Sequence, residues 1–238
     1  MSGGQKAKAF VIRYMHAGWF LLYSAFYLVG FSLVERAGHI HYHMIHTWLD
    51  DQIPFCEYFI VPYYLWFGLI AWAVCYFIFC VKDRNEYYKM ISMLMIGMTL
   101  FLIVSVVYPN KLDLRPASVD TSNVFGLLVS GLYRTDTPTN VLPSIHVFNT
   151  MAILYAVNGS DQLRRKKVTI AVVNILSILI ILATMFLKQH SVIDVSLDIV
   201  MSVILQVICD RIYETGTERV LQPEAQPQFS AVESYRRM

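Results

Sequence analysis

The sequence predicts an all-α protein, a polytopic membrane helical bundle with six transmembrane helices. Of its 238 residues, 56% are hydrophobic and only 15% are charged, whereas soluble domains carry about 25% charged residues. The positive mean hydropathy of +0.50 comes from several separated apolar stretches, which favours many spans over a single anchor. The net charge of +2 is too small to indicate a nucleic-acid partner.

Six stretches are apolar over a length that approaches the ~20 residues needed to span a membrane. The first is rich in aromatic side chains and holds His16, with Arg13 near its start. The fourth is short unless it begins at Pro143 and continues to Ser160. The predicted spans cover residues 10–33, 58–81, 90–108, 144–157, 168–187 and 192–212.

The positive charges predict the orientation, because loops rich in Lys and Arg stay in the cytoplasm. One set of span ends carries Lys6, Lys8, Arg13, Lys82, Arg84, Lys89, Arg164, Arg165, Lys166, Lys167, Arg211, Arg219, Arg236 and Arg237. The opposite set carries only Arg36, Lys111, Arg115, Arg134 and Lys188. We therefore expect a multi-pass protein of the cell membrane with both termini cytoplasmic.

The spans divide the chain into three regions. Residues 1–9 form a cytoplasmic N-terminal segment, and residues 10–213 form the six-span domain, whose longest outer loop is 109–142. Residues 214–238 are polar and lack apolar periodicity, so we expect a disordered cytoplasmic tail.

Three polar clusters border the apolar stretches. Pro143-Ser144-Ile145-His146 enters the fourth stretch, Lys188-Gln189-His190 leaves the fifth, and Lys111 through Arg115-Pro116 follows the third. Because successive spans alternate in direction, all three clusters fall on the same outer face. The sequence therefore predicts an outward-facing site at the membrane surface.

His190 and Asp194 have a spacing that would place both on one helix face, about 6 Å apart along the axis. An acid beside one imidazole nitrogen fixes the tautomer and leaves the other nitrogen free to attack or to exchange a proton. The alternative is structural, because Ser191 and Asp194 also fit a capping box that starts a helix. That alternative accounts for Asp194 but not for His190.

Ser144 and His146 lie at a predicted helix start, with Pro143 in the first turn and the serine hydroxyl near free backbone N–H groups. Helix N-termini bind anions, so a phosphate fits here. The alternative is an ordinary cap with His146 at the membrane interface.

Lys111, Arg115 and Lys188 are the cations near this face, and fixed cations stabilise a phosphoryl group in transfer. Alternatively, they anchor the span ends to lipid headgroups. Asp198 lies one turn beyond Asp194, within an apolar stretch where an acid costs about 2.5–3.5 kcal/mol. We expect it to support the site, or else to bond a neighbouring helix.

A histidine-rich loop raises the possibility of a metal site. His39, His41, His43 and His46 precede Asp50 with partly helical ligand spacing. The pattern matches no known zinc signature, and an interfacial amphipathic segment would look the same. We therefore expect no metal and no cofactor.

Together these residues resemble the type 2 phosphatidic acid phosphatase superfamily of integral-membrane enzymes. That family has a Lys…Arg-Pro motif after the third span, Pro-Ser-x-His opening the fourth, and His-x-x-x-Asp between the fifth and sixth. The counterparts here are Lys111…Arg115-Pro116, Pro143-Ser144-Ile145-His146 and His190…Asp194, in the same order and at the same span edges. The architectural similarity covers nearly all of the six-span region.

Some positions depart from the common pattern. Lys111 precedes Arg115 by only four residues, Ile145 replaces the usual glycine, and Thr184 stands where an arginine is common. Lys188-Gln189-His190 looks more like the branch that contains inositol phosphorylceramide synthases. Hydrolysis and headgroup transfer are therefore both open.

The resemblance implies a role for each position. His190 would be the nucleophile that forms a phosphohistidine, with Asp194 orienting it. His146 would protonate the leaving alcohol and then activate water or an acceptor hydroxyl. The phosphoryl group would be held by Lys111, Arg115, Ser144 and Lys188.

The leading hypothesis is thus a metal-independent phosphatase that acts on a lipid phosphate or diphosphate at the outer face of the bilayer. One alternative is a phosphotransferase that moves a phospho-headgroup between lipids. A second is a non-catalytic membrane protein that binds an anionic lipid. The oligomeric state is open.

Overall fold

The chain folds into a bundle of long α-helices, in a computed structural model that describes residues 3–38 and 41–221. Within those residues only two short parallel strands, β1 and β2, break the helical pattern, so the predicted all-α class is confirmed. The elements in chain order are α1 (Gly3–Arg36), β1 (His43–Met44), α2 (Trp48–Gln52), the 3-10 helix η1 (Glu57–Phe59), α3 (Ile60–Phe79), α4 (Arg84–Val107), β2 (Asn110–Lys111), α5 (Val124–Thr135), α6 (Ile145–Gly159), α7 (Lys167–Phe186) and α8 (Val192–Leu221).

Five helical stretches among the described residues are long and apolar enough to cross a membrane, which makes the chain a multi-pass membrane protein. They cover Tyr14–Arg36, Glu57–Phe79, Arg84–Val107, Lys167–Phe186 and Val192–Tyr213. The predicted count of six is not confirmed, because α6, which contains the fourth predicted span, has only 15 residues. At about 1.5 Å per residue it is shorter than the ~30 Å hydrocarbon core.

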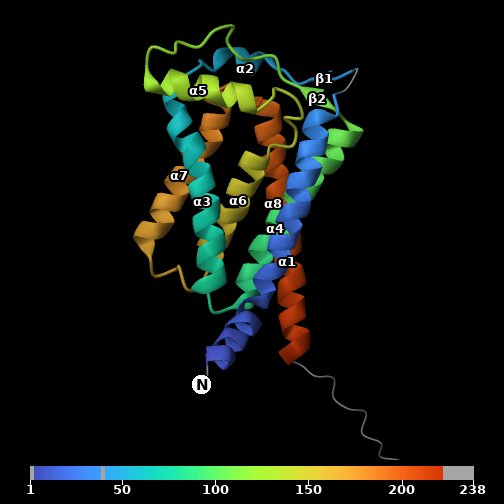
Figure 1. The fold of residues 1–238 in the computed structure, drawn as a ribbon, viewed down its shortest axis with the longest axis vertical. Coiled ribbons are helices and arrows are strands. Elements are labelled where there is room, and N and C mark those ends of the chain that lie inside the picture. The colour runs from blue at the N-terminus through green and yellow to red at the C-terminus, as the bar shows by residue number, and fades with distance from the viewer. Residues whose placement is uncertain (1–2, 39–40, 222–238) are drawn as a thin grey trace, which may run out of the picture.

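Helix α6 lies at the centre of the bundle (Figure 1). It packs against α3, α4, α7 and α8, and most of its side chains are buried. Because protein surrounds this helix, its polar ends are screened from lipid by the longer helices around it.

The two ends of the bundle differ. Figure 1 shows α2, α5 and the two strands gathered at the upper end, whereas α1 begins and α8 ends at the lower end. The first and last described residues therefore lie at the same end of the molecule. The polar clusters singled out in the sequence lie at the other end.

Two predicted boundaries and one predicted loop differ from the structure. Helix α1 already begins at Gly3, inside the predicted 1–9 segment, because no helix breaker separates the two. Helix α8 continues to Leu221, past the predicted boundary at 213, and residues 222–238 lie outside the described part of the chain. The long loop 109–142 contains α5, an amphipathic helix whose buried residues lie on one face.

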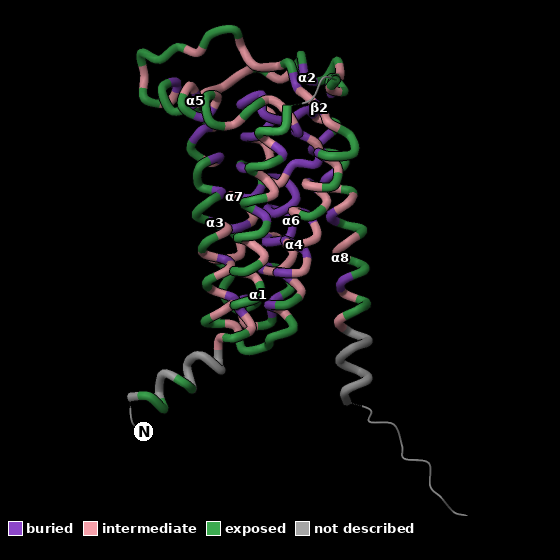
Figure 2. Tube along the Cα trace, turned by 45° about the vertical axis from the view of Figure 1, so that its right-hand side comes forward, coloured by how far each residue is buried: buried purple, intermediate pink, exposed green. Residues whose placement is uncertain are grey.

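The distribution of buried and exposed side chains fits a lipid environment. Figure 2 shows buried residues concentrated along the inside of the bundle and exposed residues along the outer faces of its helices. Many exposed side chains are large and apolar, such as Trp19 at 74% and Val168 at 78%. Such extensive apolar exposure is unfavourable in water and favourable in a bilayer.

Candidate active site

A layer of buried polar side chains lies where α6 and α8 begin and α7 ends. These side chains come from distant parts of the sequence and are each exposed by less than a tenth. They are Asp50, Ser144, His146, Lys188, Gln189, His190, Ser191, Asp194 and Asp198.

The turn that carries His190 is shaped by the end of α7. Lys188 has a left-handed backbone with φ of 52°, which reverses the chain. The backbone N–H groups of Gln189 and His190 both donate to the carbonyl of Thr184, at 2.9 and 3.1 Å. This compact turn directs the imidazole of His190 into the bundle.

His190 is held on both sides of its ring. Its Nδ1 lies 3.2 Å from Asp194 Oδ2, and its Nε2 lies 2.9 Å from the hydroxyl of Ser144. The same Asp194 oxygen accepts the backbone N–H of Ser191 at 3.1 Å. Asp194 therefore both caps the start of α8 and contacts the histidine.

The geometry of this pair differs from the one expected. His190 precedes α8, which begins at Val192, so the two side chains do not share a helix face. They meet because the turn before the helix folds His190 back over the first turn of α8.

Ser144 is the N-cap of α6, and its hydroxyl accepts the N–H of Val147 at 3.3 Å. Pro143 precedes the cap, so the expectation that it lies in the first helical turn is wrong. The backbone N–H of Ser144 donates to Asp198 Oδ2 at 2.6 Å. Asp198 thus ties α8 to the start of α6, as expected of a supporting residue.

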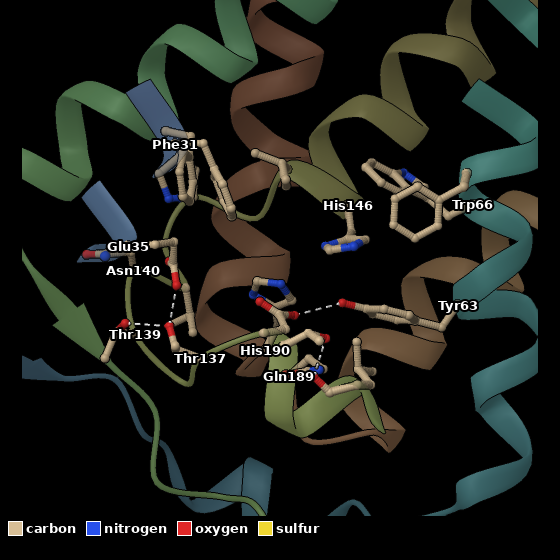
Figure 3. Close-up of a pocket in the computed structure, with 18 of the residues that line it drawn as sticks. Phe31, Glu35, Tyr63, Trp66, Thr137, Thr139, Asn140, His146, Gln189 and His190 are labelled. Carbon is tan, nitrogen blue, oxygen red and sulfur yellow. Dashed lines mark hydrogen bonds between the residues drawn. The ribbon is translucent and has the colours of Figure 1, made fainter. Parts of the chain in front are cut away.

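His146 faces His190 across the start of α6 (Figure 3). The two ring centroids are 6.0 Å apart, and the ring of His146 packs against Tyr63 at 4.6 Å and Trp66 at 4.4 Å. Its Nδ1 is buried and has no hydrogen-bond partner in the protein. Two imidazoles from separate segments therefore bracket one space.

The three cations predicted to surround the site do not lie together in the structure. Arg115 donates to the side-chain oxygen of Gln189, with its guanidinium 4.4 Å from the ring centroid of Tyr133. Burial lowers the pKa of Arg115, and the nearby carboxylate of Asp136 opposes that shift. Arg115 thus contacts Gln189, the residue that precedes His190, and not His190 itself.

Lys188 points away from this space. Its ammonium donates to the backbone carbonyls of Asp50 and Ile53. Lys111 lies in β2, which pairs with β1, and its backbone forms a β-bridge with Thr139. Its side chain does not line the cavity beside the two histidines. Lys188 is only two residues from His190 in the sequence, yet its ammonium does not lie beside that imidazole.

Asp50 is a residue whose role the sequence did not indicate. Its carboxylate accepts the hydroxyl of Ser191 at 2.7 Å and the N–H of Val192 at 2.8 Å. Together with the lysine contact to its carbonyl, these bonds attach α2 to the His190 turn. A capping box of Thr47 and Asp50 was detectable in the sequence, but its distant partner was not.

Asp136 is a second such residue. It follows α5, and its Oδ2 accepts the hydroxyl of Tyr63 at 3.2 Å. Burial raises the pKa of Asp136, while the nearby side chains of His190 and Arg115 oppose that shift. Nothing in the polar loop distinguishes this acid from its neighbours in sequence.

Asn110 fixes the approach to α6. Its side chain accepts the N–H of Leu142 at 2.9 Å and donates to the carbonyls of Leu142 and Tyr108 at 3.1 and 2.9 Å. Its own carbonyl accepts the N–H of Asn140. These bonds join the segment after α4 to the segment that leads into Ser144.

A cavity of about 380 Å³ opens beside the two histidines. Its walls come from α1, α3, α4, α5, α6 and the His190 turn, and they include His146, Gln189 and His190. Leu28 and Phe67 also line it and are exposed by 63% and 57% on α1 and α3. The cavity therefore opens sideways, between two helices that face lipid.

The histidine-rich loop does not gather into a cluster. His43 stacks on Tyr108 with centroids 4.0 Å apart, and His46 pairs with Asp51 at 3.0 Å, which raises the pKa of His46. In the described part of the chain, no group of three or more His, Cys, Asp or Glu residues could hold a metal ion. His39 lies outside the described residues.

The fold and the site together define a multi-pass helical membrane protein with a buried histidine and carboxylate centre at one end. A scan against protein-family models and searches of curated proteins and of solved structures gave no match.

Proposed function

We propose that the chain is a lipid phosphate phosphatase of the type 2 phosphatidic acid phosphatase superfamily, acting on a lipid phosphate or diphosphate at the outer face of the cell membrane. The observation that carries the proposal is the pair His146 and His190, whose centroids lie 6.0 Å apart beside a cavity open to the bilayer. That separation leaves room for one phosphorus atom between two imidazoles.

The chemistry follows from the contacts of each ring. Asp194 on Nδ1 fixes the tautomer of His190, so that Nε2 carries the lone pair and attacks phosphorus. The P–O bond to the lipid breaks as His146 gives a proton to the leaving oxygen. Water then attacks the phosphohistidine and returns its proton to His146, which restores both residues.

Arg115 and Ser144 are the groups best placed to hold the phosphoryl oxygens. The Ser144 hydroxyl already lies 2.9 Å from His190 Nε2. Arg115 is bound to Gln189, and a phosphoryl oxygen can replace the amide oxygen as its acceptor. The placement of Lys111 and Lys188 supports no direct phosphate contact.

In this proposal α6 also crosses the membrane, which brings the number of spans to six, and both termini are cytoplasmic. The positive loops support the cytoplasmic side. The shared end of the bundle where α1 begins and α8 ends supports an even number of crossings (Figure 1).

A phosphotransferase is the second candidate. The cavity beside the histidines carries the carboxylates Glu35 and Asp136. A site for a lone phosphate dianion is not expected to place two acids in its wall, since like charges repel. In a transferase, the hydroxyl of a second lipid replaces water in the second step.

The test is phosphate release by detergent-solubilised protein from phosphatidic acid and from isoprenyl phosphates and diphosphates. We expect release that a strong chelator does not reduce. His190→Ala is expected to lower the rate to background, and His146→Ala to lower it about 10²–10⁴-fold. His41→Ala is the matched control, since His41 is exposed on the outer loop.

The outcomes separate the candidates. Headgroup transfer that needs a second lipid, without phosphate release, favours the transferase. No turnover of any lipid phosphate, with both histidine variants folded and indistinguishable from the wild type, favours a non-catalytic lipid-binding protein and contradicts the proposal.

A further inference from the structure

The cavity beside the histidines has an acidic wall. Among the described residues that line it, Glu35 and Asp136 are acidic and no lysine or arginine is present. Arg115 does not line the cavity, and its guanidinium donates to the side-chain oxygen of Gln189, which does. The cavity therefore offers more negative than positive charge to whatever enters it.

Glu35 is held open to the cavity near the end of α1. Its Oε2 accepts the hydroxyl of Thr137 at 2.6 Å, and that hydroxyl lies 2.8 Å from the hydroxyl of Thr139. Figure 3 shows Glu35, Thr137, Thr139 and Asn140 gathered on one side of the cavity, with Trp66 on the other side and the two histidines between them.

Aromatic rings form much of the remaining wall. They come from α1, α3 and α4 and are Tyr27, Phe31, Tyr63, Tyr64, Trp66, Phe67 and Phe101. Phe31 stacks on Phe101 with centroids 5.7 Å apart. Aromatic faces attract cations, and the attraction is stronger where the contact is shielded from water.

Buried polar atoms in this wall lack partners in the protein. They are Tyr27 Oη, Trp66 Nε1, Asn140 Oδ1 and Gln189 Nε2, and each of these residues is more than nine-tenths buried. Unpaired buried polar groups are costly, and those in a binding site are expected to bond a polar ligand. Tyr27 Oη and Asn140 Oδ1 can accept from an ammonium N–H, whereas the N–H groups of Trp66 and Gln189 can donate to phosphoryl oxygens. The wall therefore suits a polar headgroup and not hydrocarbon alone.

We infer that this cavity binds the ammonium group of a phospholipid headgroup, with carboxylates Glu35 and Asp136 and the aromatic rings around it, while the attached phosphate lies between His146 and His190. This inference rests on the phosphotransferase candidate of the proposed function and names its headgroup donor as a zwitterionic phospholipid of the choline or ethanolamine type. The volume of about 380 Å³ is within the range of small-ligand pockets.

The position of the cavity opening indicates that the headgroup belongs to a membrane lipid and not to a soluble molecule. Leu28 and Phe67 are exposed on the lipid-facing sides of α1 and α3 and also line the cavity. A lipid can therefore leave its acyl chains in the bilayer while its headgroup enters from the side. A soluble phosphocholine would not use this apolar entrance.

In the reaction that follows, His190 Nε2 forms a bond to phosphorus as the P–O bond to the diacylglycerol oxygen breaks and His146 protonates that oxygen. The ammonium-bearing phosphate stays on His190. The hydroxyl of water or of a second lipid then attacks phosphorus and gives its proton to His146, while the bond between phosphorus and His190 Nε2 breaks and the imidazole leaves.

Binding is tested separately from turnover with the full-length His190→Ala protein in maltoside detergent. The probes are dihexanoyl phosphatidylcholine, phosphatidylethanolamine and phosphatidylglycerol, followed by the change in tryptophan fluorescence, since Trp66 lines the cavity. We expect the first two to bind at least tenfold more tightly than the glycerol lipid. Free phosphocholine is a fourth probe and is expected to bind more weakly than the choline lipid.

Glu35→Gln is the main variant, because it removes the charge and keeps the shape. It is expected to reduce the preference for ammonium headgroups about tenfold. Asp113→Asn removes one charge from an exposed position outside the cavity and is expected to leave the preference unchanged. Phe31→Leu is a second variant that weakens binding of the choline lipid by removing an aromatic face.

Equal or tighter binding of phosphatidylglycerol overturns the inference, as does an unchanged preference in both folded variants. Free phosphocholine binding as tightly as the choline lipid overturns the assignment to a lipid. The transferase candidate fails differently: wild-type protein then binds these lipids with the stated preference and transfers no headgroup to water or to a second lipid.

Discussion

Asp136 lies in surroundings that oppose its negative charge. Burial raises its pKa, and the nearby side chains of His190, Arg115 and Tyr63 offset this only in part. The folded protein therefore favours the protonated carboxyl more than the unfolded chain does. The ionised form is a site for a cation, which ties this residue to the ammonium proposed above.

We predict a pH-dependent effect of Asp136→Asn on stability. A raised folded-state pKa contributes stability that is present below the unfolded value of about 3.9 and is lost as the pH rises through the folded value. The variant should therefore match the wild type near pH 4 and become more stable than it at higher pH.

The measurement is thermal unfolding in detergent across that pH range. Glu57→Gln is a suitable comparison, since Glu57 lies at the same end of the bundle and outside the cavity. A constant difference between Asp136→Asn and the wild type at all pH values would contradict the prediction.

At the scale of elements, the short helix α2 acts as a clamp on the site. Asp50 is buried and accepts two hydrogen bonds from residues around the start of α8, and its carbonyl accepts the ammonium of Lys188. The position of His190 therefore depends on a loop far away in the sequence.

We predict that Asp50→Ala lowers both stability and activity without touching His190 itself. The change leaves the hydroxyl of Ser191 and the N–H of Val192 without their acceptor, at a cost of about 1–3 kcal/mol for each unsatisfied buried group. Thermal unfolding and the rate of phosphate release measure the two effects. The neighbouring Asp51→Ala should have little effect, since Asp51 forms only an exposed pair with His46.

Helices α4 and α6 approach each other closely at Gly97. A Cβ at this position would lie 2.1 Å from Cδ1 of Phe148, which is two residues after His146. We predict that Gly97→Ala destabilises the bundle by about 1–3 kcal/mol, because the buried ring must shift.

Gly68→Ala on α3 is the matched control, since no atom lies within 4 Å of a Cβ built there. Thermal unfolding of both variants is the measurement. Equal melting temperatures for Gly97→Ala and Gly68→Ala would show that the contact between α4 and α6 adapts without cost.

For the whole molecule, the direction of α6 determines how the chain crosses the membrane. Thr121 is exposed before α5 and Arg165 is exposed after α6. In a cysteine-free background, a membrane-impermeant maleimide should label Thr121→Cys in intact cells. It should label Arg165→Cys only after the membrane is opened. Labelling of both positions in intact cells would mean that α6 does not cross.

Much of the fold could be predicted because burial of backbone groups in a bilayer permits few alternatives to helices. The five long helices coincide with apolar stretches that the composition alone indicates. Helix α5 was missed because its polar surroundings resemble a loop. The end of α8 was missed because the tail has no apolar periodicity.

The candidate site was predicted in part. His146, His190, Asp194, Ser144 and Asp198 come together because short-range turns and caps place them near the helix starts. The residues that sequence reasoning missed reach the site only through contacts between distant segments, which no local pattern indicates. They are Asp50, Asn110, Glu35 and Asp136.

The sequence by itself determined the membrane environment, the helical class and the residue types that can carry phosphoryl chemistry, since these depend on composition and local spacing. Only the tertiary structure decided which charges face the cavity. Lys188 is adjacent to the His190 turn in sequence, yet its long side chain turns toward α2, while Glu35 reaches the cavity from the other end of the chain. Side-chain direction depends on packing between distant helices, and no local pattern encodes it.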